Sequence, residues 1–105
     1  MEKNNQYTTL ILALEDLSKK GYTGNFSVTE EGLLNDGKGN LYQPKNVALM
    51  EFHRFEGQTN PADSSILYAI KISGGLKGTV VDAYGAQASE ITSEFMNQVK
   101  QKQFD

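Results

Sequence analysis

The chain has 105 residues, a formal net charge of −3, 38% hydrophobic residues and no cysteine. A chain of this length forms one domain with one modest hydrophobic core, because two folded units would need more residues. The lack of cysteine excludes thiol nucleophiles, disulfides and thiolate metal sites, and the single histidine, His53, excludes multi-histidine metal sites within one chain. The acidic balance supplies no basic surface for nucleic acid. We therefore expect one domain over residues 1–105 with no metal, no cofactor and no nucleic-acid partner.

No stretch of the sequence predicts export or a membrane span. The longest strongly apolar run, residues 10–14, is far shorter than the ~20 residues that cross a bilayer. The start of the chain has no cationic region that leads into a long apolar segment, as a signal peptide would. We expect a cytoplasmic protein of bacterial type that does not contact membranes.

In chain order, the first predicted element is a helix over residues 6–20. Apolar side chains recur there at spacings of three and four residues, which places them on one side of a helix. Lys19 and Lys20 suit the negative end of this helix, and Gly21 is typical of the position just after a helix ends. The apolar stripe consists of Tyr7, Leu10, Ile11, Leu14 and Leu17.

The glycine-rich middle of the chain predicts strands, because apolar and polar residues alternate there. Gly74 and Gly75 supply the positive φ angles of a tight hairpin turn between the last two strands. Pro61 makes the segment around it a loop, because proline cannot donate a hydrogen bond to a sheet. The five strand candidates are residues 22–28, 32–35, 47–56, 65–73 and 76–84, with residues 41–42 as a candidate sixth fragment.

The last predicted element is a helix from Ser89 to about residue 102. The Ser89 hydroxyl can accept hydrogen bonds from the first free amides, and Glu90 suits the positive end of the helix. A block of strands between two terminal helices favours an α+β fold with two layers. We expect an antiparallel meander of about five strands that carries both helices on one face. The stripe of the last helix consists of Ile91, Phe95, Met96 and Val99.

The second face of this sheet is less polar than a face in water should be. Leu67 and Ala69 lie opposite the main apolar set of strand 65–73, and Val81 and Ala83 share one face of strand 76–84. Two helices on one face would leave these side chains exposed, and monomers rarely expose large apolar patches. We therefore expect this sheet face to contact a second copy or a ligand. The alternative is an edge from Arg54 to Asp63 that binds a partner or a small ligand.

The densest polar cluster contains Glu51, His53, Arg54 and Glu56. In a strand, Glu51 and His53 face one side while Arg54 and Glu56 face the other, unless a bulge rearranges them. His53 is a candidate general base supported by Glu51, and Arg54 is a candidate anion clamp. The simpler interpretation is a solvent-exposed set of cross-strand pairs.

Two further segments resemble phosphate-binding turns. Lys77 follows the Gly-Gly turn, and Asp82 and Tyr84 lie in the strand that runs toward the last helix. Neither segment requires a ligand. The glycines before Lys77 are explained by a hairpin turn, and Asp82 by an exposed position in a strand. A strand reached through a tight hairpin is antiparallel to its neighbour, unlike the strand of a phosphate-binding turn. Residues 36–40 lack the acidic ligands of an EF-hand and the order of a P-loop, so they predict a turn. The candidate binding residues are His53, Arg54, Glu56, Lys77, Asp82 and Tyr84.

A set of short segments spread along nearly the whole chain forms a pattern. The segments are Gly21-Tyr22 with Phe26, Arg54-Phe55-Glu56-Gly57 with Pro61 and Asp63, Tyr68-Ala69-Ile70, Gly75-Leu76-Lys77-Gly78, and Ala83-Tyr84-Gly85. Together they resemble a family of short bacterial proteins of about this length, some of which bear the label phosphoribosylpyrophosphate synthetase. The resemblance implies a shared fold and no established activity. His53 departs from the pattern, where tyrosine or another residue is expected.

The label would require ATP, a metal ion and a sugar phosphate in one site, which normally takes two α/β domains and a parallel sheet. We therefore expect a binding or interaction module that self-associates. The alternative is a small nucleotide- or sugar-phosphate-binding protein or enzyme. An enzyme would bring at least three of the candidate side chains into one concave pocket, whereas a binding module would leave them dispersed.

Overall fold

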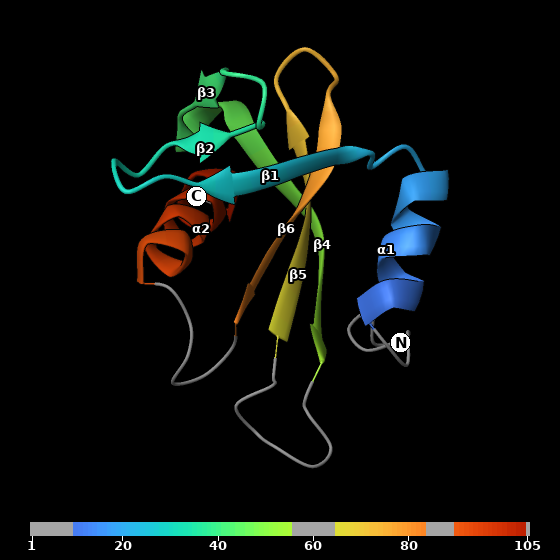
Figure 1. Cartoon of the computed structure of the whole chain (residues 1–105). Coiled ribbons are helices and arrows are strands. Elements are labelled where there is room, and N and C mark those ends of the chain that lie inside the picture. Colours follow the sequence, from blue (N-terminus) through green and yellow to red (C-terminus); the bar gives the residue numbers. More distant parts are fainter. Residues whose placement is uncertain (1–9, 56–64, 84–89, 105) are drawn as a thin grey trace.

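The computed structural model describes residues 10–55, 65–83 and 90–104 (Figure 1). Two helices enclose a block of strands in the described chain, which confirms the predicted α+β class. The fragment at residues 41–42 is a strand, so the described sheet has six strands and not five. The elements are α1 (Leu10–Lys19), β1 (Gly24–Val28), β2 (Leu34–Asn35), β3 (Leu41–Tyr42), the 3₁₀ turn η1 (Pro44–Asn46), β4 (Val47–Phe55), β5 (Ser65–Ile72), β6 (Lys77–Ala83) and α2 (Glu90–Phe104).

The strands form one sheet in the order β3-β2-β1-β6-β5-β4. β4, β5 and β6 are antiparallel neighbours, and β1, β2 and β3 form a second antiparallel set. β1 joins the two sets, because Gly24 to Phe26 pair in parallel with β6 while Ser27 and Val28 pair with β2. The sheet is therefore two meanders with a parallel junction, not one continuous meander. Alternation along a strand defines its two faces and leaves the direction of its neighbour open, so the sequence pattern did not reveal this junction.

The two helices cover opposite faces of the sheet. Along β5, the even-numbered residues from Ile66 to Ile72 pack in the cluster that contains α2, whereas Leu67 and Ala69 pack with Leu17 of α1. Figure 1 shows β4, β5 and β6 passing between the two helices. The expected placement of both helices on one face is corrected accordingly. A strand that is apolar on both faces needs cover on both, and α1 covers Leu67 and Ala69, while Val81 on the same face stays 43% exposed.

The larger hydrophobic core lies between the sheet and α2. Phe95, Met96 and Val99 are almost fully buried there, as the predicted stripe requires, whereas Ile91 is partly exposed. The smaller core, under α1, buries Ala13, Leu17, Tyr22, Leu67 and Ala69. Because each large apolar side chain stabilises the fold by about 1.5–3 kcal/mol when buried, α2 is held to the sheet more strongly than α1.

Candidate functional site

A bulge in β4 decides which way the predicted polar cluster faces. Leu49 pairs with Ile70 of β5, and the next pair is Glu51 with Ala69, so Met50 is an extra residue that is half exposed. The bulge resets the alternation of the strand. Residues 51, 53 and 55 consequently face α1, while residues 52 and 54 face α2 on the same side as Leu49.

His53 is fully buried on the α1 side of β4, with 0% of its surface exposed. Its Nε2 atom lies 2.9 Å from Oε1 of Glu51. Because a carboxylate only accepts hydrogen bonds, the hydrogen belongs to Nε2 of His53, which donates to Glu51. Opposite His53 in β5 is Leu67, a member of the small core under α1. The solvent-exposed ladder expected for this cluster is wrong for His53, which is a core side chain with a carboxylate partner.

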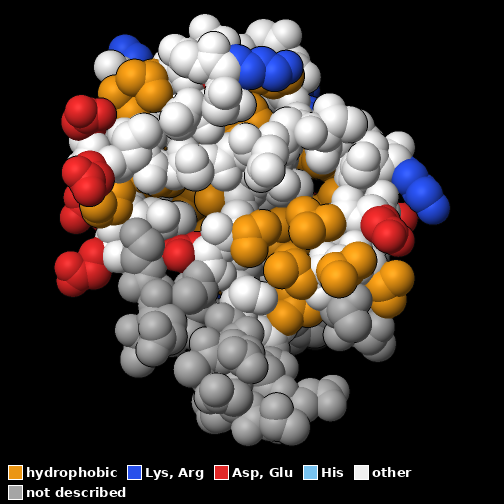
Figure 2. Space-filling view, in the orientation of Figure 1, with side chains coloured by type: hydrophobic (Ala, Val, Ile, Leu, Met, Phe, Trp, Pro, Cys, Tyr) orange, Lys and Arg blue, Asp and Glu red, His pale blue; other side chains and the backbone are white. Residues whose placement is uncertain are grey.

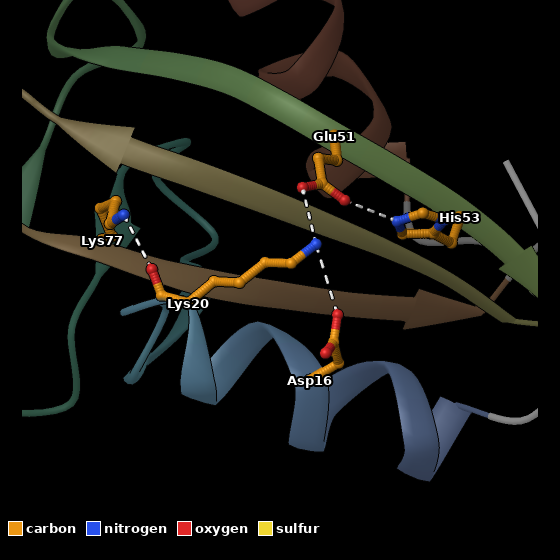
Figure 3. Close-up of polar contacts among 5 residues, drawn as sticks. All are labelled: Asp16, Lys20, Glu51, His53 and Lys77. Atoms are coloured by element: carbon orange, nitrogen blue, oxygen red, sulfur yellow. Dashed lines mark hydrogen bonds and ion pairs between the residues drawn. The ribbon is translucent and has the colours of Figure 1, made fainter. Parts of the chain in front are cut away.

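Glu51 links β4 to the end of α1 through a lysine (Figure 3). Oε2 of Glu51 lies 3.9 Å from Nζ of Lys20, and the same Nζ lies 3.3 Å from Oδ2 of Asp16, one helical turn earlier. Lys20 and Asp16 are exposed enough that each ion pair stabilises by no more than about 1 kcal/mol. These contacts orient α1 on the sheet through Asp16, Lys20 and Glu51. They also give the His53 imidazole a structural role, because Glu51 is its partner.

Lys77 extends from β6 to the same end of α1. Its Nζ donates a hydrogen bond of 2.9 Å to the carbonyl oxygen of Lys20 and lies 4.6 Å from the centre of the Tyr22 ring. A cation beside the last carbonyls of a helix offsets their negative charge, and the ring adds a cation–π contact. Lys77 thus caps α1. Burial raises the pKa of the Tyr22 phenol, Glu51 raises this pKa further, and Lys20 lowers it.

Arg54 faces the opposite side of β4, beside Phe52. Its guanidinium carbon lies 6.0 Å from the centre of the Phe52 ring, and Nζ of Lys100 in α2 lies 5.3 Å from the same centre. Two cations from elements far apart in the sequence thus share one aromatic ring. Asp82 is on this face two strands away, since Arg54 and Asp82 both pair with Ile66 of β5.

The described candidate residues do not converge on one site. His53 and Lys77 face α1, whereas Arg54 and Asp82 face α2, with the sheet between the two pairs. His53 and Lys77 are also separated along the strands, because His53 pairs with Leu67 of β5 whereas Lys77 pairs with Lys71, four residues further along. Of the four described candidates, no three therefore lie on one face of the sheet.

The two remaining candidates, Glu56 and Tyr84, lie outside the described residues. The loop predicted around Pro61 also lies there. The structure describes the other four candidates, His53, Arg54, Lys77 and Asp82.

Residues 36–40 and the Gly74-Gly75 segment, which were considered as ligand-binding loops, are both hairpin turns. Between β2 and β3, Oδ1 of Asp36 accepts hydrogen bonds from the amides of Lys38 and Asn40 at 2.7 and 3.2 Å. A hydrogen bond from the Asn40 side chain, followed by these amide bonds, lowers the pKa of the Asp36 carboxyl. Between β5 and β6, Gly74 and Gly75 have φ angles of 105° and 106°, as the predicted turn requires.

An acidic hollow of about 280 Å³ lies between the β1–β2 turn and the start of α2. Figure 2 shows acidic side chains gathered on this side of the molecule, at the left. Sequence reasoning missed the hollow, because its two acidic segments are far apart in the chain. The available signals were a glutamate doublet before Gly32 and two glutamates four residues apart at the start of the last helix. The acidic lining residues are Glu30, Glu31, Glu90 and Glu94.

A second hollow, of about 170 Å³, lies beside the turn that joins β5 to β6, and Asn46, Lys71 and Ser73 are among its lining residues. Neither hollow is lined by one of the four described candidates. Within residues 10–55, 65–83 and 90–104, no group of three or more His, Asp or Glu side chains is placed to hold a metal ion.

No family model, curated protein or solved structure matches this chain. In the part of the chain that the structure describes, neither helix is both long enough and apolar enough to cross a membrane.

Proposed function

We propose that this protein is an interaction module that self-associates through the outer face of α1. The observation that carries the proposal is the exposure of two large apolar side chains on a ten-residue helix: Ile11 is 68% exposed and Leu12 is 48% exposed. Figure 2 shows hydrophobic side chains gathered on the side where α1 lies. α1 covers Leu67 and Ala69 of the sheet. We therefore place the contact between two copies on the outer side of α1 and not on the sheet itself.

The charges on α1 favour a second copy as the partner. Ile11, Glu15 and Lys19 are exposed and four residues apart, so they form one row along the outside of the helix. A twofold axis that crosses an antiparallel pair of α1 helices midway between Glu15 and Lys19 would place Glu15 of each copy near Lys19 of the other, with one Ile11 side chain toward each end of the contact. The same row of one helix is therefore complementary to itself in charge.

The separation of the candidate residues supports binding over catalysis. His53 and Lys77 are engaged in holding α1 in place, and Arg54 and Asp82 lie on the other face of the sheet. The alternative of a nucleotide-binding enzyme would need a pocket that several of these groups share. The larger described hollow is lined by glutamates, which repel phosphate groups.

Sedimentation equilibrium over a range of concentrations tests the proposal. We expect the wild-type chain to dimerise in the micromolar range, and Ile11→Asp to be monomeric there, because the substitution replaces an exposed apolar side chain of the contact with a charge in each copy. Leu76→Asp is the matched control, since Leu76 is similarly exposed but lies at the β5–β6 turn. Glu15→Lys should weaken the dimer, and Glu15→Lys combined with Lys19→Glu should restore it.

A wild-type chain that stays monomeric through the micromolar range would refute the proposal. So would an Ile11→Asp variant that keeps the wild-type dimer.

A further inference from the structure

We propose that α1 is a switch for self-association: a second copy binds only while α1 lies closed on its own sheet. The inference rests on the contact between two copies proposed above, and it names what controls that contact. Opening of α1 would release the partner copy, and binding of the partner copy would hold α1 closed.

The two sides of α1 make different contacts. Ala13 and Leu17 are fully buried against the sheet, whereas Ile11, Glu15 and Lys19 form the exposed row of the proposed contact. A helix of ten residues is not stable by itself in water. The outer row depends on helical spacing, so it exists as one row only while the inner side of α1 is packed.

The C-terminal end of α1 is tied to the sheet and forms the hinge. Gly21 has a φ angle of 99°, and the amide of Tyr22 donates a hydrogen bond of 2.9 Å to the carbonyl oxygen of Leu17, which closes the last turn. Nζ of Lys77 in β6 donates to the carbonyl oxygen of Lys20 at 2.9 Å (Figure 3). Opening would therefore swing α1 about this end.

The layer that α1 closes is the weaker of the two. Among the described residues, its core has five buried members, against twelve on the α2 side. Lys20 lies 3.3 Å from Asp16 and 3.9 Å from Glu51, but these partly exposed ion pairs stabilise the closed helix only weakly. A partner that binds one of two states shifts the population toward that state. The second copy has this effect on the closed state of α1.

Closure and self-association are then linked quantitatively. Both copies must be closed in the dimer, so the apparent dissociation constant rises with the inverse square of the closed fraction. A closed fraction of about one third would raise this constant about ninefold. The linkage is reciprocal, so dimerisation must also lower the open fraction of α1.

Sedimentation equilibrium of a variant on the inner side of α1 tests the switch. Leu17→Ala loosens α1 from the sheet and leaves the outer row unaltered, so the dissociation constant of the dimer should rise about tenfold. Met96→Ala is the matched control, because Met96 is also buried but lies in the core under α2. It should leave the dissociation constant within about twofold of the wild-type value.

Hydrogen exchange of the wild-type chain gives a second measurement, which decides the question even if Leu17→Ala does not fold. The amides of α1 should exchange more slowly above the dissociation constant of the dimer than below it. Those in the middle of α2 should exchange at the same rate at both concentrations.

The outcomes separate the switch from the self-association itself. A wild-type chain that stays monomeric would overturn both. A wild-type dimer whose dissociation constant is unchanged in a folded Leu17→Ala variant would overturn the switch alone. The same holds if the exchange of the α1 amides does not depend on protein concentration in a chain that dimerises.

Discussion

Gly78 faces Gly24 across the parallel junction of β6 and β1, and the ring of Phe26 lies against both. A Cβ atom at Gly78 would overlap this ring and the carbonyl oxygen of Gly24. The backbone of Gly78 does not need a positive φ, so what requires glycine here is the close approach of the ring. The aromatic side chain fills the space that two missing side chains leave in the sheet.

Gly78→Ala should therefore lower the free energy of unfolding by about 1–3 kcal/mol, the usual cost of overpacking a core. Denaturant unfolding measures the change. Asn25→Ala is the control, because Asn25 is exposed in the same pair of strands and should change stability by less than about 0.5 kcal/mol. Equal stability of Gly78→Ala and the wild type would show that the Phe26 ring can move aside.

At the scale of the element, α1 depends on the sheet for its stability. A helix of ten residues is not stable by itself in water, so its contacts with β4, β5 and β6 hold it in place. Tyr22 contributes directly, since it is buried in the small core and its ring receives the Lys77 ammonium. Burial, the first cause of its raised pKa, means that the folded state favours the neutral phenol.

The stabilisation that this shift provides is fully present below the unfolded pKa of about 10. It should be lost as the pH rises through the higher pKa of the folded state, because ionisation then costs more in the folded chain than in the unfolded one. Urea unfolding at a series of alkaline pH values measures the loss. Tyr22→Phe should lose less stability over this pH range than the wild type. If the stability of Tyr22→Phe and of the wild type changed equally with pH, Tyr22 would not be the group responsible.

At the scale of the whole molecule, the sheet separates two layers of unequal strength. Among the residues that the structure describes, twelve buried residues form the cluster on the α2 side, and five form the cluster on the α1 side. Local opening costs less free energy where fewer apolar contacts are lost. The α1 layer should therefore open more readily than the α2 layer while the rest of the fold stays intact.

Hydrogen exchange followed by mass spectrometry measures this difference. We expect the amides of α1 to exchange faster than those of the middle of α2. Leu17→Ala should accelerate exchange in α1 while changing α2 little, because Leu17 is buried only in the smaller cluster. Val99→Ala is the counterpart in the larger cluster and should accelerate exchange across the sheet. Equal protection of the two helices in the wild-type chain would contradict the unequal layers.

The candidate site shows where prediction from sequence stops. Spacing in β4 placed Glu51 and His53 on one side and Arg54 on the other, and the structure confirms this separation. Spacing did not show that His53 is buried, because burial depends on α1 covering that face. It also did not show that Lys100 meets Phe52, because the contact joins residues of β4 and α2 that only packing brings together.

The α+β class follows from local patterns that backbone geometry imposes: the stripe of α2, the alternation of β5 and the glycine turn after it. Three features depend on contacts between distant segments: the two helices lie on opposite faces, β1 runs parallel to β6, and Met50 bulges from β4. The physical reason is that a periodic pattern marks which side of an element must be covered. What covers it depends on the packing of the whole chain.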